Sequence, residues 1–596
     1  MTTPEILIKD GLVFDGNGGE GVRADVAIAN GTVLEIGPGL EAGPDTRVID
    51  AAGRWVTPGF VDMHTHYDAE VEFDPSLHES LRHGVTTVLT GSCSLSMVMG
   101  EPKDLADQFC RVEAIPREVV LPLLEQVKDW DSPTEYLEHL RTLDLGPNVA
   151  CLLGHSTLRS AVMGMARSVE PKLRPSEAEL QRMEQLLDEA LDVGFVGLSI
   201  STLPWDKLDG EEVYRSRPMP SVFGSWREYR RLAKRLRQRD KVLQAVPNIS
   251  TKVNIFLFLL LSAGLFVRKA LKTTLISMMD VRADRFAFRI AGVLSRIVNT
   301  ILRGDFRMQA LPEPFELYAD GMDIVVFEEF EAGTAALHIT DQIKRTELLR
   351  DPAYRKRFKA QWRRKIVPRA YHRDLRYAEV LSCPDASAVG KTFAQLGEER
   401  GQDGIDVFLD LVIEHGRELR WYTLMGNDRP KWLRWILRHP DILIGFSDAG
   451  AHLRNMAHYN FPMRMLKRVR DAEAEGQPFM TVGRAVQRLS SEIAQWLDID
   501  AGVLAVGKRA DVVVIDPAAL DDRVEAIHEE PVPELNGLAR LVRRNPAAVN
   551  AVLVNGRLAV EAGEPLPEVG HAPGYGQVLR AGEPCPGTRA RQPVSA

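Results

Sequence analysis

Apolar and polar residues alternate along both ends of the chain. Near the start, the alternation covers residues 6–14 and 25–36, and an Asn30-Gly31 pair divides the second stretch. Near the end, residues 511–515 form an apolar run and residues 551–560 enclose a second Asn-Gly pair. Side chains of a strand alternate between its two faces and Asn-Gly favours a tight hairpin turn, so both ends are predicted to form β-strands. Such hairpins are unstable alone, and we expect the two ends to build one small β domain together.

Between the two ends, apolar runs alternate with amphipathic segments. Ser132 and Ser176 each precede a glutamate by three residues, which is the pattern of a capped helix start. After Ser176, apolar residues recur at helical spacing as far as Gly194, and residues 195–200 then predict a strand. This alternation of strands and helices is typical of a parallel sheet covered by helices.

Length and composition limit the class of protein. A chain of 596 residues is expected to form two or three domains. Its formal net charge of −9 argues against nucleic acid as the main partner. Five cysteines are too few for a disulfide framework, and the N-terminal residues lack the basic and apolar regions of a signal peptide. The predicted location is therefore cytoplasmic, in a reducing compartment, and the oligomeric state stays open.

One long apolar run, residues 255–267, needs a separate interpretation. It is too short to span a bilayer, so no membrane association is expected. A buried barrel strand or a core helix explains it better.

His64 and His66 form the first candidate for chemistry. They follow a Pro58-Gly59 turn and a short apolar run that predicts a strand. On an extended segment, side chains two residues apart point to the same face, so both imidazoles can reach one metal ion. Two chance histidines in a loop are the alternative. The β-rich start before the pair and a second reactive residue after it, Cys93, favour the metal site.

Cys93 and Asp448 each lie where an apolar run gives way to small or polar residues. In a barrel of parallel strands, catalytic residues lie at the carboxyl ends of the strands. Cys93 is only 27 residues after His66, which is enough for one helix and one returning strand. A thiolate ligand is therefore favoured over a buried structural thiol for Cys93. For Asp448, the alternative to a catalytic role is a helix N-cap.

These residues fall in motifs that resemble the amidohydrolase superfamily, and within it the D-aminoacylase branch, the N-acyl-D-amino-acid deacylases. The resemblance covers nearly the whole chain but weakens between Arg159 and Leu337. The motifs, in order, are VTPGFVDMHTHYD (56–68), GVTTVLTGSCSLSM (84–97), GHSTLR (154–159), VGLSIST (196–202), GKTFAQLGEERG (390–401), IGFSDAGAHL (444–453) and VGKRADVVVID (506–516).

The resemblance implies a fold. It implies an α/β chain in which a (β/α)8 TIM barrel lies beside a composite β-sandwich formed by both chain ends. On this basis residues 1–57 and 491–596 form the two parts of the sandwich, the second with a C-terminal tail. Residues 58–490 form the metal-dependent hydrolase barrel with insertions.

The resemblance also implies a site. Zinc would be held by His64, His66, Cys93 and Asp448. Asp448 would take the proton from an attacking water and pass it to the leaving nitrogen. A metal makes bound water more acidic and a nearby carboxylate can accept its proton, which explains this choice of residues. His155, Arg159 and His452 would bind substrate.

The sequence departs from the family in the middle of the barrel. Family members take two further zinc-holding histidines from this region, but no histidine lies between His155 and His338. Met278 and Met279 stand where these histidines are expected, and Asp280 stands near the position of a substrate-binding lysine. We therefore expect about one divalent metal ion per chain.

Two basic segments can be explained either as binding surfaces or as ordinary helix surface. In residues 354–376, Tyr354, Phe358 and Trp362 recur every four positions, which predicts an amphipathic helix rather than a nucleic-acid surface. Residues 268–303 line the entrance for an anionic substrate or are helix surface.

The predicted function is metal-dependent hydrolysis of a carbon–nitrogen bond outside peptides, in a small molecule such as an N-acyl-D-amino acid. One alternative is an amidohydrolase that acts on a cyclic amide or lactone. The other is a catalytically silent barrel that serves as a binding module.

Overall fold

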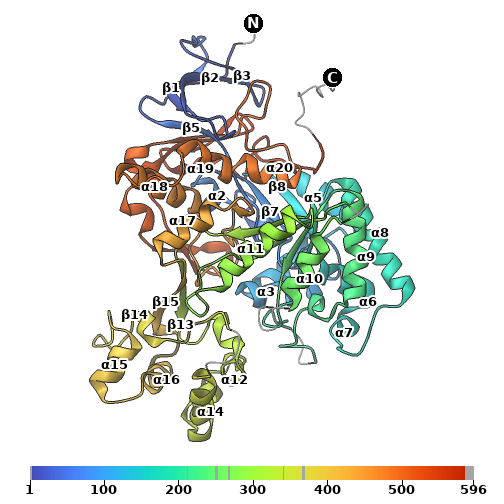
Figure 1. Ribbon diagram of the computed structural model, residues 1–596, viewed down its shortest axis with the longest axis vertical. Helices are drawn as coiled ribbons and strands as arrows, with labels where there is room; N and C mark the ends of the chain where they lie inside the picture. Colours follow the sequence, from blue (N-terminus) through green and yellow to red (C-terminus); the bar gives the residue numbers. More distant parts are fainter. Residues whose placement is uncertain are drawn as a thin grey trace.

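A curled sheet of eight strands forms the centre of the protein (Figure 1). The computed structural model describes residues 3–210, 213–248, 253–265, 269–339, 341–364 and 369–583. Every neighbouring pair in this sheet is parallel, as the alternation of strands and helices predicted. In sheet order the strands are β6 (Phe60–Asp62), β7 (Val85–Thr90), β8 (Asn148–Gly154), β9 (Gly197–Ser201), β10 (Val242–Val246), β11 (Lys272–Leu275), β12 (Asp305–Ala310) and β16 (Ile442–Ile444).

The two edges of this sheet meet through the segments that follow its edge strands. Just after β6, the amide of Met63 donates to the carbonyl of Gly445 at 2.8 Å, and the amide of Asp448 donates to the carbonyl of His64 at 3.1 Å. These bonds place the ends of the first and last strands side by side, as in a barrel.

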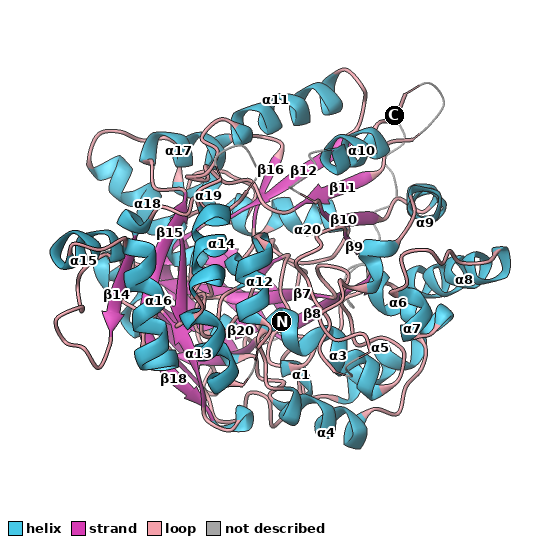
Figure 2. Ribbon diagram, turned by 90° about the horizontal axis from the view of Figure 1, so that it is seen from below, coloured by secondary structure: helices cyan, strands magenta, loops and turns pink. Residues whose placement is uncertain are grey.

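Helices surround the sheet, as Figures 1 and 2 show. The predicted caps are confirmed: Ser132 accepts from the amide of Glu135, and Ser176 forms a capping box with Glu179. The helices are α1 (Glu70–Phe73), α2 (His78–Leu81), α3 (Pro102–Glu113), α4 (Arg117–Val127), α5 (Pro133–Thr142), α6 (His155–Met163), α7 (Met165–Ser168), α8 (Glu177–Val193), α9 (Trp226–Gln238), α10 (Val253–Ser262), α11 (Ala287–Thr300), α17 (Pro430–Arg438), α18 (Phe461–Ala474), α19 (Val482–Leu489) and α20 (Ser491–Leu497).

Strands from both chain ends pair in a second sheet of nine strands. The link between the ends is β17, which pairs with β5 on one side and β20 on the other. Asn30 has a φ of 50° and Gly31 of 73°, so this predicted hairpin turn is confirmed. The two-layer sandwich and the domain boundaries stay predictions. The strands are β1 (Ile6–Val13), β2 (Val22–Ala29), β3 (Thr32–Gly37), β4 (Arg47–Asp50), β5 (Trp55–Pro58), β17 (Val512–Ile515), β20 (Val549–Val554), β21 (Arg557–Glu561) and β22 (Glu564–Pro565).

The connection from β12 to β16 contains an inserted lobe with its own apolar core (Figure 1, bottom). The predicted amphipathic helix is confirmed for the first part of residues 354–376, because Tyr354, Phe358 and Trp362 on α14 are buried in that core and α14 ends at Trp362. The lobe consists of β13 (Phe315–Asp320), β14 (Ala378–Ser382), β15 (Arg420–Gly426), α12 (Glu331–Leu337), α13 (Gln342–Arg350), α14 (Pro352–Trp362), α15 (Phe393–Arg400) and α16 (Gly404–His415).

The apolar run at residues 255–267 forms a helix, α10, over its first part, while residues 266 and 267 lie outside the described residues. The alternative of a barrel strand is wrong. The helix buries Phe258 and Leu259 but leaves Phe256 56% exposed. Across the described residues, no helix combines the length and apolar character needed to cross a bilayer.

Because strands from both chain ends share one sheet, a destabilising substitution at one end should also destabilise the strands of the other end. Val514 on β17 is fully buried and packs in one cluster with Ile8 and Val26 from the first strands. Val514→Asp should lower the free energy of unfolding by about 3 kcal/mol or more, because it buries an unpaired carboxyl group. Amide hydrogen exchange over residues 6–29 should accelerate.

The matched control is Val506→Asp, at a side chain that is 63% exposed. It should leave melting and exchange unchanged. Normal protection of residues 6–29 in Val514→Asp would show that the two ends are stabilised independently.

Candidate functional site

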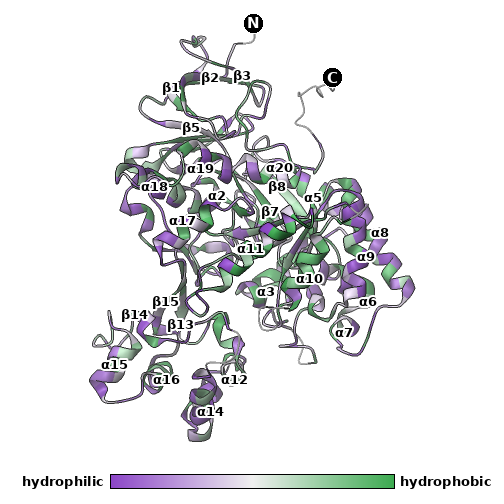
Figure 3. Cartoon of the chain, viewed as in Figure 1, coloured by the Kyte–Doolittle hydropathy of each residue, from purple (hydrophilic) through white to green (hydrophobic). Residues whose placement is uncertain are grey.

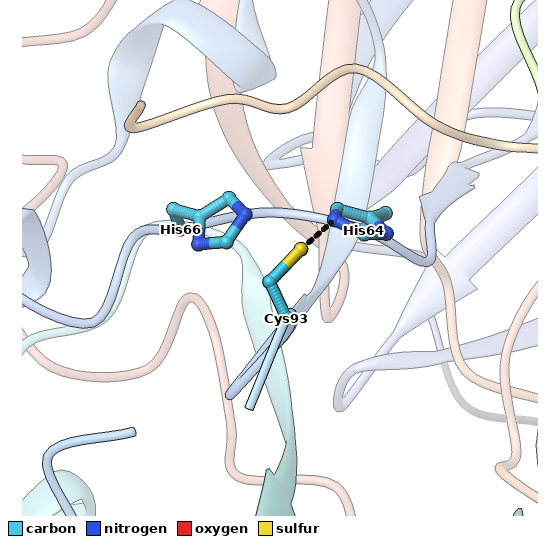
Figure 4. Close-up of side chains that lie close together, drawn as sticks. All are labelled: His64, His66 and Cys93. Carbon is cyan, nitrogen blue, oxygen red and sulfur yellow. Dashed lines mark hydrogen bonds between the residues drawn. The ribbon is translucent and has the colours of Figure 1, made fainter. Parts of the chain in front are cut away.

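The four side chains expected at the metal site converge at the carboxyl ends of neighbouring strands. His64 and His66 follow β6, Cys93 follows β7, and Asp448 follows β16, which meets β6 where the sheet closes. Figure 4 shows the two imidazoles and the thiol facing one another. The structure therefore brings together residues that are up to 384 positions apart in the chain, as the distance from 64 to 448 gives.

The distances within this group are short. The Nε2 atom of His64 lies 3.2 Å from the Sγ atom of Cys93 and 3.5 Å from Oδ1 of Asp448. The Nε2 atom of His66 lies 3.2 Å from the same Oδ1. Ligand atoms of His64, His66 and Cys93 all lie within 4.8 Å of one another. Two nitrogens, one sulfur and one oxygen are a donor set that suits zinc.

Both histidines are oriented by a second set of contacts that the sequence did not reveal. Oε1 of Gln309 on β12 lies 2.7 Å from Nδ1 of His64. A carboxamide oxygen only accepts hydrogen bonds, so Nδ1 donates and the lone pair of Nε2 faces Cys93 and Asp448. Oε1 of Glu113, at the end of α3, lies 3.0 Å from Nδ1 of His66, an ion-pair contact that lacks hydrogen-bond geometry. Such partners fix the tautomer and the ring orientation of metal-ligating histidines.

Cys93 has a partner of the same kind. Its backbone amide donates to Oε1 of Gln244 on β10 at 3.0 Å. Gln244 is a buried glutamine inside an otherwise apolar strand, and that pattern could have identified it. Gln309 is also buried, but its strand contains Asp305 and Arg307 as well. Glu113 lies on an amphipathic helix, where a glutamate is ordinary, so no comparable signal marked it.

Burial and mutual charges shift the pKa values of all four groups; burial opposes the charge of His66, yet Glu113 and Cys93 hold its pKa well above the usual range. Burial lowers the pKa of His64 to about 4, so its imidazole is neutral and able to act as a ligand. Burial opposes the charge on Asp448, yet the hydrogen bond and charge of His66 hold the pKa of that carboxyl well below its usual range. Burial raises the pKa of Cys93 to about 12. A thiol in this environment ionises when it binds a metal, and the residues present therefore fit one.

Two further acidic groups surround the site. Burial raises the pKa of Glu113 to about 8 despite the nearby charge of His66. Burial also raises the pKa of Asp206 to about 6, and Ser201 donates a hydrogen bond to this carboxyl. Burial therefore favours the neutral form of both carboxyl groups, and a bound divalent cation would favour their charged forms instead.

The three predicted substrate-binding residues differ in their positions. Burial lowers the pKa of His452, and Asp448 is close enough for its charge to oppose that shift. His155 and Arg159 on α6 are fully buried instead, at 3.1 and 2.6 Å from the carboxylate of Glu228 on α9. This cluster joins two helices and gives both residues a structural role. Substrate binding by His155 and Arg159 stays a prediction that the proposals below do not use.

The predicted departure in mid-barrel is also visible. Met278 is buried, and Asp280 pairs with Arg429 at 2.6 Å rather than facing the four candidate ligands.

Asp448 is followed by no helix within the next ten residues, so the helix-cap alternative for it is wrong.

Comparisons of the sequence with known proteins identify related chains. The model described as "Amidohydrolase family" matches residues 47–201, a range that includes His64, His66 and Cys93. An uncharacterized protein of Mycobacterium tuberculosis is 47% identical over 584 residues, which cover 97% of this chain and 95% of that protein. An N-acyl-D-glutamate deacylase of Alcaligenes xylosoxydans xylosoxydans is 35% identical over 195 residues, 33% of this chain and 36% of that enzyme.

A solved structure shares the fold. The N-acyl-D-glutamate deacylase of Bordetella bronchiseptica, complexed with zinc and a phosphonate inhibitor, has a TM-score of 0.62 at 22% identity. The similarity covers 97% of this chain and 100% of that chain. The predicted α/β architecture with its curled parallel sheet is thereby confirmed.

The contact between Glu113 and His66 yields a testable prediction. Glu113→Gln keeps the size of the side chain but removes the carboxylate that orients His66, so affinity for Zn²⁺ should fall about 10- to 100-fold. Competition with a chromophoric chelator measures this affinity. The control is Glu101→Gln, at the exposed start of the same helix, which should bind Zn²⁺ like the unmodified protein. Equal affinities in the two variants would exclude Glu113 as a positioning residue.

Proposed function

The chain belongs to the amidohydrolase family, and we propose that it is a metal-dependent enzyme that hydrolyses the amide bond of a small N-acyl compound, foremost an N-acyl-D-amino acid. One observation supports this most strongly: two imidazoles, a thiol and a carboxylate converge at the strand ends with 3.2 Å and 3.5 Å between donor atoms. Strand ends are where barrels of this kind place their chemistry. The names of the deacylases similar to this chain favour the N-acyl substrate class.

Zinc is the metal that we propose for His64, His66, Cys93 and Asp448. Imidazole, thiolate and carboxylate are its usual ligands, and a magnesium or calcium site would be built from oxygen atoms. Among the described residues, one group of side chains has ligand atoms close enough to share a metal ion, namely His64, His66 and Cys93. This favours one ion per chain. When bound, the ion supplies Lewis acidity that polarises a carbonyl group and makes water easier to ionise.

Asp448 is proposed to move the proton. Both histidines contact its Oδ1 atom, and 14% of its side chain remains exposed, so the second oxygen can face a substrate. Its low pKa keeps the carboxylate ionised at neutral pH. It can therefore accept a proton from an attacking water and donate it to the leaving nitrogen. His452, buried near this carboxylate, is proposed to contact the substrate.

Hydrolysis of a cyclic amide or lactone is the second candidate. It is favoured by the mid-barrel positions, where Gln244, Met278 and Gln309 occupy the strand ends and no histidine is present between His155 and His338. A different set of side chains in this region would present a different substrate pocket, although the proton transfer by Asp448 would be the same.

The role of Asp448 can be tested by one substitution. Asp448→Asn preserves the size of the side chain and its contacts with the histidines, but it removes the base. Loss of general-base catalysis typically lowers the rate about 10²- to 10⁴-fold, so turnover of N-acyl-D-amino acids should collapse while thermal melting is nearly unchanged. The control is Asp131→Asn, at a side chain that is 83% exposed, with normal turnover.

Three outcomes separate the candidates. Full turnover by Asp448→Asn would remove this residue from the mechanism. An unmodified protein that hydrolyses cyclic amides or lactones but no N-acyl-D-amino acid would establish the second candidate. Binding of substrates without turnover of either class would favour a silent barrel.

A further inference from the structure

An apolar cavity of about 680 Å³ lies between α10 and α11. Its walls include the ends of β10, β11 and β12, so it is at the same end of the parallel sheet as the four candidate metal ligands. Figure 3 shows hydrophobic residues along α10, the helix that forms one wall. The volume lies in the range of cavities that enclose small organic ligands. The central lining residues are Ile255, Leu259, Leu275, Met278, Leu294 and Met308.

The rim of the cavity exposes large apolar side chains to water. Phe256 on α10 is 56% exposed and Ile290 on α11 is 59% exposed, and both line the opening. Such a concentration of exposed apolar groups around a hollow is unusual for a soluble chain and indicates a site that binds an apolar group.

The inner wall shares strand β12 with a residue that orients one of the candidate metal ligands. Met308 lines the cavity, and the next residue on β12, Gln309, holds His64. The amide of Met278, another lining residue, donates to the carbonyl of Gln309 at 2.7 Å. Successive side chains of a strand face opposite sides, so Met308 and Gln309 do not themselves join the two places. The segments after β9 and β10 contribute Leu203 and Pro247 to the lining, which puts the cavity beside the strand ends where the candidate ligands lie.

The second strand connection is on β10. Val246 lines the cavity, and Gln244, two positions earlier on the same strand, accepts the hydrogen bond from the amide of Cys93. The cavity is thus bounded by the two strands that orient His64 and Cys93.

The charged residues of the lining are engaged elsewhere. The carboxylate of Asp284 accepts from the amides of Phe286 and Ala287 at the start of α11. The guanidinium of Arg369 donates to the carbonyl of Arg364. The remaining wall is mainly aliphatic and aromatic, with three flexible methionines, and it matches a ligand that has methylene groups and no charge.

We propose that this cavity holds the acyl tail of the substrate, so that the enzyme prefers amides of medium- to long-chain fatty acids over acetyl amides. The inference rests on the proposed function, because the scissile amide would lie at the cluster of His64 and Asp448. Each methylene group removed from water favours binding by about fourfold, so a tail of several methylenes adds orders of magnitude in affinity.

Two variants that narrow the cavity test this inference. Ala291→Phe introduces a ring from α11, and Ala283→Phe introduces one from the loop before that helix. Two positions on different elements are used so that the test does not depend on the folding of one variant. The control is Val293→Phe, two residues from Ala291 at a position that is 56% exposed and outside the lining. Calorimetry with sodium acetate, hexanoate and decanoate measures binding without any turnover.

Decanoate should bind the unmodified protein and Val293→Phe at least tenfold more tightly than hexanoate, and acetate should bind weakest. Ala291→Phe or Ala283→Phe, when folded, should lose at least tenfold in decanoate affinity. Equal affinity for the three acids, or unchanged decanoate binding in a folded variant, would overturn the proposal.

Hydrolysis of N-acetyl- and N-decanoyl-D-amino acids, measured in parallel, separates this inference from the proposed function. If both compounds are cleaved at rates that neither chain length nor the cavity variants change, the proposed function stands and the acyl site is wrong. If decanoate binds in the cavity but no amide is cleaved, the acyl site stands and the proposed function fails.

Discussion

The hydrogen bond from the amide of Asp448 to the carbonyl of His64 joins the last strand of the parallel sheet to the first. Because both residues are also candidate metal ligands, the contact that closes the sheet is the contact that assembles the site. Cys93 follows the next strand, and Gln244 and Gln309 reach the group from strands further around the curl. Neither chain end nor the inserted lobe contributes one of these side chains. A site built on strand ends in this way is held by the sheet itself, and loops and lobes can vary around it.

The sequence was informative where local pattern and chemistry coincide. His64, His66, Cys93 and Asp448 were predicted because each reactive residue follows an apolar run, and the structure places them within contact of one another. The hairpin turns, the capped helices and the amidohydrolase resemblance were likewise available from short motifs. His155 and Arg159 fall in such a motif too, but a fully buried pairing with Glu228 depends on a helix about 70 residues away, which no local pattern reveals.

Other features depend on three-dimensional packing. The run at residues 255–267 was expected to be buried, yet α10 exposes part of its surface beside the cavity. Hydropathy records how apolar a segment is, but it does not record what covers it. Glu113 was missed because a glutamate at the end of a surface helix is ordinary until that end meets a buried histidine. The residues that orient the candidate ligands are thus harder to predict than the ligands.

The central claim is that two imidazoles, one thiolate and one carboxylate hold a single catalytic zinc ion. X-ray absorption at the zinc edge, combined with elemental analysis of dialysed protein, tests it most directly. We predict about one zinc per chain, with one sulfur neighbour at about 2.3 Å and the remaining nitrogen and oxygen neighbours at about 2.0–2.2 Å. Two tightly held ions per chain, or a zinc environment without sulfur, would contradict this account.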